Sequence, residues 1–170
     1  MEGTVKTKSL GDTAARVGRV QLRTEKARVM ARPEPGTVQS GTPLRDTLAV
    51  MRAQGGDAVL VLHGSRLAGI LTERDVLTRV LGNGVDESRS VDDFMTASPG
   101  TLHADATLID AMRSMEQGHF RNLPLVDDAG TVVGLLRQQD LLEYVAEAFP
   151  EEILNLPPRP HQLMEEPEGA

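Results

Sequence analysis

Hydrophobic and polar positions along the chain repeat one pattern twice. Each copy begins with a short extended entry, at residues 37–39 and 101–103, and continues with a stretch in which apolar residues fall at i, i+4 and i+7. These apolar positions are Leu44, Leu48 and Met51 in the first copy and Leu108, Met112 and Met115 in the second. The spacing predicts an amphipathic helix in each copy, and Gly55 and Gly118 stand where these helices are expected to end.

Two short apolar strands and a second helix follow in each copy. The strands are "AVLVL" and "LAGIL" in the first copy and "NLPLV" and "TVVGLL" in the second, separated by the turn residues "HGSR" and "DDAG". Short apolar runs bounded by turn residues are typical of strands. The second helices are predicted over residues 73–81 and 138–149. The fold class is therefore α+β, with the order strand, helix, strand, strand, helix (βαββα) in each copy.

The two copies also match residue by residue. "PGTVQSGTPLRDTLAVM" from Pro35 aligns with "PGTLHADATLIDAMRSM" from Pro99 at an offset of 64 residues, and "GILTERD" at 69–75 aligns with "GLLRQQD" at 134–140 after a one-residue slip. One copy of about 50 residues buries too little surface to be stable alone. We therefore expect the two repeats to pack about a pseudo-twofold axis, which would leave two equivalent clefts.

The ends of the chain differ in composition from the repeats. We divide the chain into a basic N-terminal arm at 1–26, a first repeat at 27–86, a second repeat at 87–149 and a Pro-rich acidic tail at 150–170. The first 35 residues carry eight Lys and Arg against four Asp and Glu, so the remainder holds the net negative charge. A solvated arm is favoured over one that binds nucleic acid, because its charge is modest and it has no aromatic residue for base stacking.

The composition excludes several kinds of chemistry. The chain has no cysteine, which rules out a disulfide framework, a thiolate metal site and a cysteine nucleophile. The four histidines lack the spacing of metal ligands, and no Ser-His-Asp or phosphate-loop motif is present, so we expect neither a metal site nor catalytic residues. No signal-peptide core and no run of about 18 apolar residues occurs, so we expect a cytoplasmic protein without a membrane partner.

Three stretches together carry a family resemblance: "GILTERDVLTRVL", "VDDFMTASPGTLHADATLIDAM" and "MEQGHFRNLPLVDDAGTVVGLLRQQDLL". With them the chain resembles the tandem cystathionine β-synthase (CBS) domain pair, or Bateman module, over about residues 27–147. The resemblance implies a stand-alone regulatory module that binds an adenosine-type ligand (AMP, ADP, ATP or S-adenosylmethionine) between its repeats. It also implies a homodimer and an unidentified protein target whose behaviour the module changes. No cofactor is required and no catalysis is implied.

The resemblance also assigns candidate ligand-binding residues. These are Val38, Val59, Thr72, Asp75, Arg121, Asn122, Leu123, Pro124, Arg137 and Asp140. In the family pattern the Thr72 hydroxyl would face phosphate or ribose and the Asp75 carboxylate would accept hydrogen bonds from the ribose hydroxyls. That role suits a carboxylate, whose two oxygens can accept from both hydroxyls of a diol. Arg121 would bind phosphate, and Pro124 would leave a strand edge open to the base.

The Thr72-x-x-Asp75 motif has a second interpretation, as a helix capping box, and taken alone it favours capping. In the second copy Arg137 replaces the threonine and cannot cap a helix in the same way, yet Asp140 remains. Arg137 would then either add a cation for phosphate or fill its cleft and block it. Asp57 stands at the first-copy position of Arg121, so neither copy is complete. One composite site is as consistent with the sequence as two full sites.

Two functions follow from these observations. The first is a non-enzymatic nucleotide sensor, supported by the repeat and by Thr72 and Asp75. The second is a structural dimerisation module with silent clefts, in which the tail at 150–170 docks on another chain or caps the dimer; Arg137 and Asp57 favour it.

Overall fold

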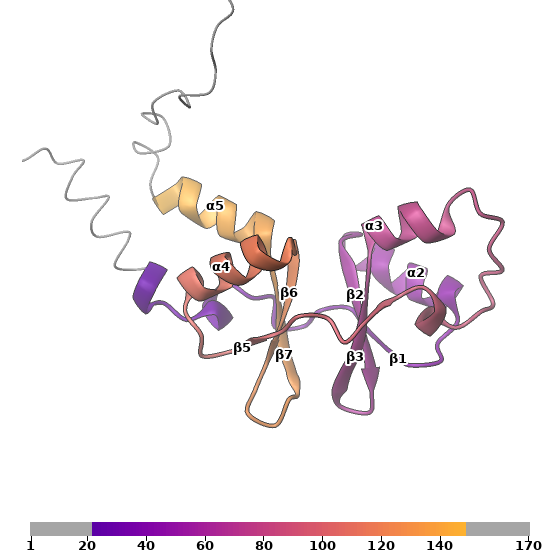
Figure 1. Cartoon of the computed structure of the whole chain (residues 1–170), viewed down its shortest axis with the longest axis horizontal. Helices are drawn as coiled ribbons and strands as arrows, with labels where there is room; N and C mark the ends of the chain where they lie inside the picture. The colour runs from indigo at the N-terminus through magenta and orange to yellow at the C-terminus, as the bar shows by residue number, and fades with distance from the viewer. Residues whose placement is uncertain (1–21, 149–170) are drawn as a thin grey trace, which may run out of the picture.

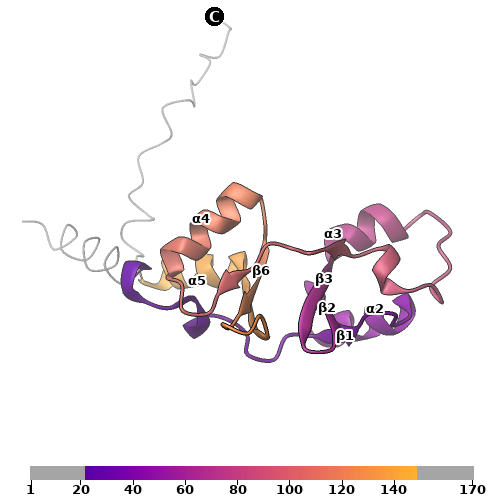
Figure 2. The same ribbon diagram turned by 60° about the horizontal axis from the view of Figure 1, so that its bottom comes forward.

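Two small sheets face each other at the centre of the molecule, and the helices lie on their outer sides (Figures 1 and 2). The computed structural model describes residues 22–148. Within this range the expected α+β class and the two βαββα repeats are confirmed. No helix in the described part of the chain is long and apolar enough to cross a membrane.

The first half is built from the first repeat and receives one strand from the second. Its elements in chain order are β1 (Thr37–Gln39), α2 (Leu44–Ala53), β2 (Ala58–His63), β3 (Arg66–Thr72), α3 (Glu73–Asp75) and the turn η2 (Val76–Val80). The sheet order is β1-β2-β3-β4, where β4 (Thr96–Ala97) comes from the start of the second repeat. Strand β1 is parallel to β2, and the other two pairs are antiparallel.

The second half repeats this arrangement. Its elements are β5 (Leu102–His103), α4 (Leu108–Gly118), β6 (Asn122–Val126), β7 (Val132–Arg137) and α5 (Gln138–Ala148), in the sheet order β5-β6-β7. Again the entry strand is parallel to its neighbour and the hairpin β6-β7 is antiparallel. Helices α3 and α5 therefore begin at the same end of the two hairpins, while the hairpin turns lie at the other end (Figure 1).

Two predicted helices differ in detail from the structure. The stretch predicted as a helix over 73–81 is α-helical only at α3 and then widens into the π-helical turn η2, in which Leu81 N donates to Val76 O at 2.9 Å. Helix α4 does not end in a left-handed glycine: His119 takes that conformation, with φ of 54°. Gly118 instead makes room, because a Cβ there would overlap the ring of Phe120.

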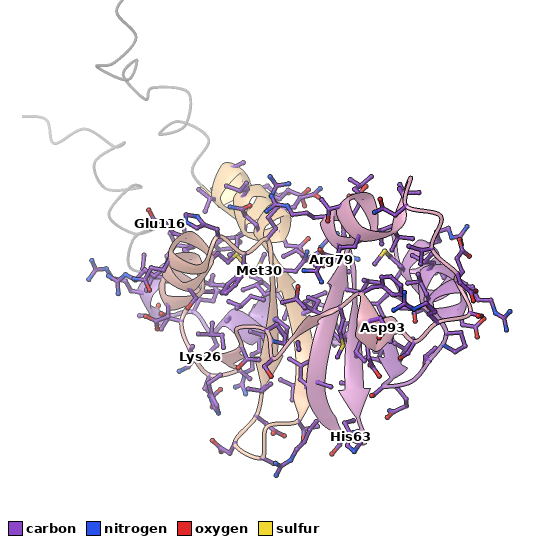
Figure 3. All side chains as sticks on the ribbon, turned by 45° about the vertical axis from the view of Figure 1, so that its right-hand side comes forward. Lys26, Met30, His63, Arg79, Asp93 and Glu116 are labelled. Carbon is purple, nitrogen blue, oxygen red and sulfur yellow. The ribbon has the colours of Figure 1, made fainter. Side chains whose placement is uncertain are left out.

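The segment at the junction of the N-terminal arm and the first repeat packs on the second repeat, and the segment at the start of the second repeat packs on the first. Around the 3-10 turn η1 (Ala27–Val29), Glu25 O accepts from Leu108 N at 3.0 Å in the second repeat. Around the 3-10 turn η3 (Val91–Asp93), Arg89 O accepts from Leu44 N at 2.8 Å in the first repeat. The two contacts are related by the repeat offset, so the exchange is reciprocal. In Figure 3 Lys26, from this entry segment, lies on the same side of the molecule as Glu116 of α4.

The hydrophobic core follows this exchange. One cluster joins Ala27 to Leu108, Leu125 and Leu136 of the second repeat. A second cluster joins the η3 segment to the first repeat and includes Val91, Phe94, Leu44, Val59 and Leu71. A third cluster lies between the sheets and contains Ala58, Leu60, Ile70 and Leu135. This third cluster confirms that the repeats pack against one another through their sheets.

Candidate functional site

A cavity of about 620 Å³ opens where the two strand-to-helix junctions meet. Its lining includes Thr72 and Asp75 from the first repeat and Asn122 and Arg137 from the second. Both copies of the repeated motif therefore face one composite cavity. A second cavity, of about 480 Å³, lies at the hairpin turns and is lined by residues such as Arg66 and Asp128. The two cavities have different linings, and the motif residues of both repeats line the first, in agreement with one composite site; two equivalent clefts stay a prediction.

Asp75 is the most enclosed charged group of the cavity, with 8% of its surface exposed. Its Oδ2 accepts from Thr72 N at 2.9 Å and from Thr72 Oγ1 at 2.6 Å, while Asp75 N donates to Thr72 Oγ1 at 3.3 Å. This is a complete capping box, so the capping interpretation of the motif is confirmed. The other oxygen, Oδ1, is held only by longer contacts of 3.5 Å to Thr96 Oγ1 and to Arg79 Nη2.

Asp140 is engaged in a different way. Arg137 Nε donates to Asp140 Oδ2 at 2.8 Å, and Arg137 Nη2 donates to Asp140 Oδ1, so one guanidinium takes both carboxylate oxygens. Arg137 Nη1 also donates to Asp57 Oδ2 of the first repeat. The hydrogen bond to Asp140 raises the pKa of Arg137 above its ordinary value against the opposing effect of burial, and Asp57 raises it further. The aspartate of the second copy is therefore held by an ion pair with Arg137, where that of the first copy is held by a threonine capping box.

Two cations of the cavity wall are free to meet an anion. The guanidinium groups of Arg74 and Arg121 line the cavity and have no hydrogen bond or ion pair with any other residue in the range 22–148. Both residues are exposed, and the exposed side chain of His119 stands beside Arg121 at the same wall. The carboxylates of Asp57, Glu73 and Asp75 also line the cavity, and Arg137 pairs with Asp57. Arg74 and Arg121 therefore supply cations suited to phosphate at a wall that also carries acidic groups.

The cavity also has an apolar wall. Ile70, Pro99, Phe120 and Leu142 contribute to it. The ring of Phe120 is fitted against Gly100, where a Cβ would lie 2.7 Å from the ring. A flat apolar wall beside a carboxylate and free cations suits a ligand that combines a ring, hydroxyl groups and an anion.

The structure divides the sequence-predicted site residues into two groups. Five of them line the cavity: Thr72, Asp75, Arg121, Asn122 and Arg137. Asp140 is joined to them through Arg137. The remaining four, Val38, Val59, Leu123 and Pro124, do not line it.

The physical reason for this division is that apolar strand residues fill the cores. Val38 packs against the first-repeat cluster, Val59 belongs to that cluster, and Leu123 belongs to the second-repeat cluster. Pro124 is fully buried in β6 and pairs with Leu135 on one side, whereas β5 pairs only with Leu125 and Val126. That the strand edge at Pro124 is open to a base stays a prediction.

Several cavity residues were not predicted from the sequence. Thr96, His119, Phe120 and Gln138 all line the cavity. Phe120 had a detectable signal, because it is one of three phenylalanines and follows Gly118 by two residues. Thr96 had none, because it reaches Asp75 only through the pairing of β4 with β3.

Comparison with known proteins is consistent with this geometry. The family model described as "CBS domain" matches residues 27–82 and 91–147. The CBS domain-containing protein CBSCBSPB2 of Arabidopsis thaliana is 39% identical over 102 residues, which are 59% of this chain and 19% of that protein. The chain therefore spans about a fifth of the length of this relative.

Solved structures show the same fold. A protein with CBS domains from Burkholderia ambifaria is 29% identical, with a TM-score of 0.61 over 68% of this chain and 85% of that one. The structure of CBSX2 in complex with AMP is 22% identical, with a TM-score of 0.61 over 72% of this chain and 97% of that one.

Proposed function

Because the chain belongs to the CBS domain family, with two CBS domains in tandem, we propose that its composite cavity binds an adenine nucleotide such as AMP and that occupancy modulates a protein partner. The observation that carries the proposal is Asp75, an enclosed carboxylate on the wall of a 620 Å³ cavity whose Oδ1 is held only by long contacts. The complex of the related CBSX2 with AMP supports the choice of ligand. The proposed role is regulatory and not catalytic.

In this proposal Asp75 binds the ribose through a hydrogen bond. An ionised carboxylate only accepts hydrogen bonds, so a ribose hydroxyl can donate to it without a change of protonation. The capping bonds from Thr72 occupy Oδ2, which leaves Oδ1 for the ligand in exchange for the 3.5 Å contact with Thr96. Capping and ligand binding therefore use different oxygens of the same side chain and are compatible.

Arg121 and Arg74 supply the phosphate contact in this proposal. Their free guanidinium groups can donate to a phosphate without first losing an ion pair. A guanidinium can also bind a phosphate through two parallel hydrogen bonds. Phe120 and Ile70 supply apolar surface for the adenine ring.

The test is isothermal titration of AMP, ADP, ATP and S-adenosylmethionine into the wild-type protein, with 2′-deoxy-AMP as the matched ligand that lacks one ribose hydroxyl. AMP is expected to bind, and 2′-deoxy-AMP is expected to bind about tenfold or more weakly because one hydrogen bond to a charged group is lost. Absence of binding by every adenosine ligand at millimolar concentration would reject the proposal.

A dimerisation module is the second candidate function, and exposed leucines favour it. Leu77 and Leu142 occupy equivalent positions in the second helical segments of the two repeats and are 57% and 60% exposed, and Leu81 is 59% exposed. Large exposed apolar side chains on neighbouring helices are suited to contact with a second copy. The tail at 150–170, expected to dock on another chain or to cap a dimer, lies outside the described residues. Sedimentation of wild type and of a Leu77→Glu, Leu142→Glu variant tests this candidate, which requires the variant to lose the dimer.

A further inference from the structure

The carboxylates of the repeated motif have different partners in the two copies, and of the two only Asp75 lines the cavity. In the first copy Asp75 Oδ1 has contacts of 3.5 Å only, to Thr96 and Arg79. In the second copy both oxygens of Asp140 accept from the single guanidinium of Arg137. A ribose hydroxyl at Asp140 would need an oxygen that this guanidinium already occupies.

Residues of both repeats hold the side chain of Arg137 in place. The side chain of Arg137 is 13% exposed and that of Asp140 is 15% exposed, so the pair is largely shielded from water. Arg137 also donates to Asp57, which is 80 residues away in the chain and belongs to the other repeat. A forked guanidinium between two carboxylates occupies the acceptor oxygens for which a ligand hydroxyl would have to compete. A nucleotide at Asp140 would have to break this arrangement before it could bind.

We propose that Arg137 is a built-in occupant of the second ribose site, so that each chain binds one nucleotide, at Asp75, and not two. The proposal rests on the proposed function of the cavity and specifies its stoichiometry. It makes Arg137 a specificity-determining residue: its side chain fills the position of a ligand diol and does not serve as the phosphate contact. The cations left for phosphate are then Arg121 and Arg74, which have no other partner within residues 22–148.

Replacement of Arg137 by the residue found in the first copy tests the proposal. Arg137→Thr recreates the Thr-x-x-Asp motif of Thr72 and Asp75 at Asp140 and removes the guanidinium from that carboxylate, so that one oxygen is left for a ligand as at Asp75. Titration with AMP is expected to give one site per chain for wild type and two sites per chain for the variant. The added site is expected to disappear in the double variant Arg137→Thr, Asp140→Ala. The added site is also expected to bind 2′-deoxy-AMP more weakly than AMP.

Controls separate the possible outcomes. Arg113→Thr removes the same charge from an exposed side chain on α4, away from the cavity, and should keep one site. Circular dichroism establishes that each variant is folded, and Arg137→Ser provides a second variant that frees Asp140. If the wild-type protein binds two nucleotides per chain, the proposal is wrong whatever the variants do.

The remaining results are equally decisive. If wild type binds one nucleotide and both folded Arg137 variants still bind one, Arg137 does not block a site and the inference is wrong while the proposed function stands. If these variants lose affinity at the existing site, Arg137 is a phosphate contact and the inference is again wrong. If wild type binds no nucleotide, the proposed function fails and the inference fails with it.

Discussion

Arg79 donates through Nη1 to the backbone carbonyl of Phe94 at 2.9 Å, which ties the second helical segment of the first repeat to the entry segment of the second. The same guanidinium nitrogen reaches Met95 O at 3.1 Å, and Nη2 lies 3.5 Å from Asp75 Oδ1. Figure 3 places Arg79 and Asp93 on the same half of the molecule. One side chain therefore joins the exchanged segment to the carboxylate of the cavity.

Loss of this connection should destabilise the fold. Arg79→Ala removes the donors to two carbonyl groups next to the buried ring of Phe94, and we expect a loss of about 1–3 kcal/mol in the free energy of unfolding. Urea denaturation followed by circular dichroism measures it. Arg74→Ala is the matched control, since the Arg74 side chain has no partner in the described part of the chain and its loss should change stability little. Equal effects of the two substitutions would contradict the role of Arg79.

The close packing of β4 on β3 can be tested at Gly69. A Cβ at this position would overlap the flexible end of the Met95 side chain, which must shift, so Gly69→Ala should cost about 1 kcal/mol, at the low end for overpacking. Met95→Ala removes the obstructing atoms, and in the double variant the two losses should be clearly less than additive. Thermal denaturation of the two single variants and the double variant measures the coupling. If the losses of the two single variants add strictly, Gly69 is not required for the close packing of Met95 and β4 on β3.

Tyr144 gives the exchange a pH dependence. Its hydroxyl donates to Glu25 Oε2 at 2.7 Å, and this hydrogen bond raises the pKa of Tyr144 because it holds the proton. The stabilisation is therefore complete below the ordinary tyrosine pKa of about 10 and is lost as pH rises through the higher pKa of the folded state. Tyr144→Phe should lose about 1–2 kcal/mol at neutral pH and show a smaller loss of stability above pH 10 than wild type. Chemical denaturation at pH 7 and at alkaline pH measures both effects, and identical pH profiles would contradict this assignment.

Arg121 should distinguish a nucleotide from a nucleoside. Its free guanidinium at the cavity wall is placed for phosphate, so Arg121→Ala is expected to weaken AMP binding by about tenfold, as one charge-assisted hydrogen bond is lost. Adenosine, which lacks the phosphate, should bind wild type and variant equally. Equilibrium titration with both ligands is the measurement, and an equal loss for AMP and adenosine would exclude a phosphate contact at Arg121.

Much of the fold was predictable because its signals are local. The strands β2 and β6 follow from short apolar runs between turns, and α2 follows from the spacing of Leu44, Leu48 and Met51. The exchange of entry segments was not predictable, because it depends on hydrogen bonds such as Leu108 N to Glu25 O between distant parts of the chain. The π-helical turn η2 was also missed, since its apolar spacing resembles that of an ordinary helix.

The sequence predicted those site residues that are charged and stand close to the ends of strands. Asp75, Arg121 and Arg137 are polar residues at strand ends, and they face the cavity. Val59 and Leu123 were assigned to the site through the family resemblance, but their apolar side chains are buried in the cores of their own repeats. The partner of Arg137 in the other repeat, Asp57, could not be inferred, because the pair forms only when the two sheets pack.

The most direct test of the central claim compares two identical capping boxes. Thr107 and Asp110 form the same box at the start of α4, with Thr107 Oγ1 donating to Asp110 Oδ2 at 2.6 Å, but Asp110 does not line the cavity. The hydrogen bonds from Thr107 hold the pKa of Asp110 below its ordinary value, because they favour the charged carboxylate. Asp110→Ala therefore reproduces the loss of a cap without any change to the proposed ligand site.

The measurement is the dissociation constant of AMP for wild type, Asp75→Ala and Asp110→Ala, each shown to be folded by circular dichroism. Both substitutions are expected to lower the melting temperature. Asp110→Ala is expected to leave AMP affinity unchanged, and Asp75→Ala is expected to weaken it by about tenfold or more. Unchanged AMP affinity in folded Asp75→Ala would contradict the account and would leave Asp75 with no function beyond the helix cap.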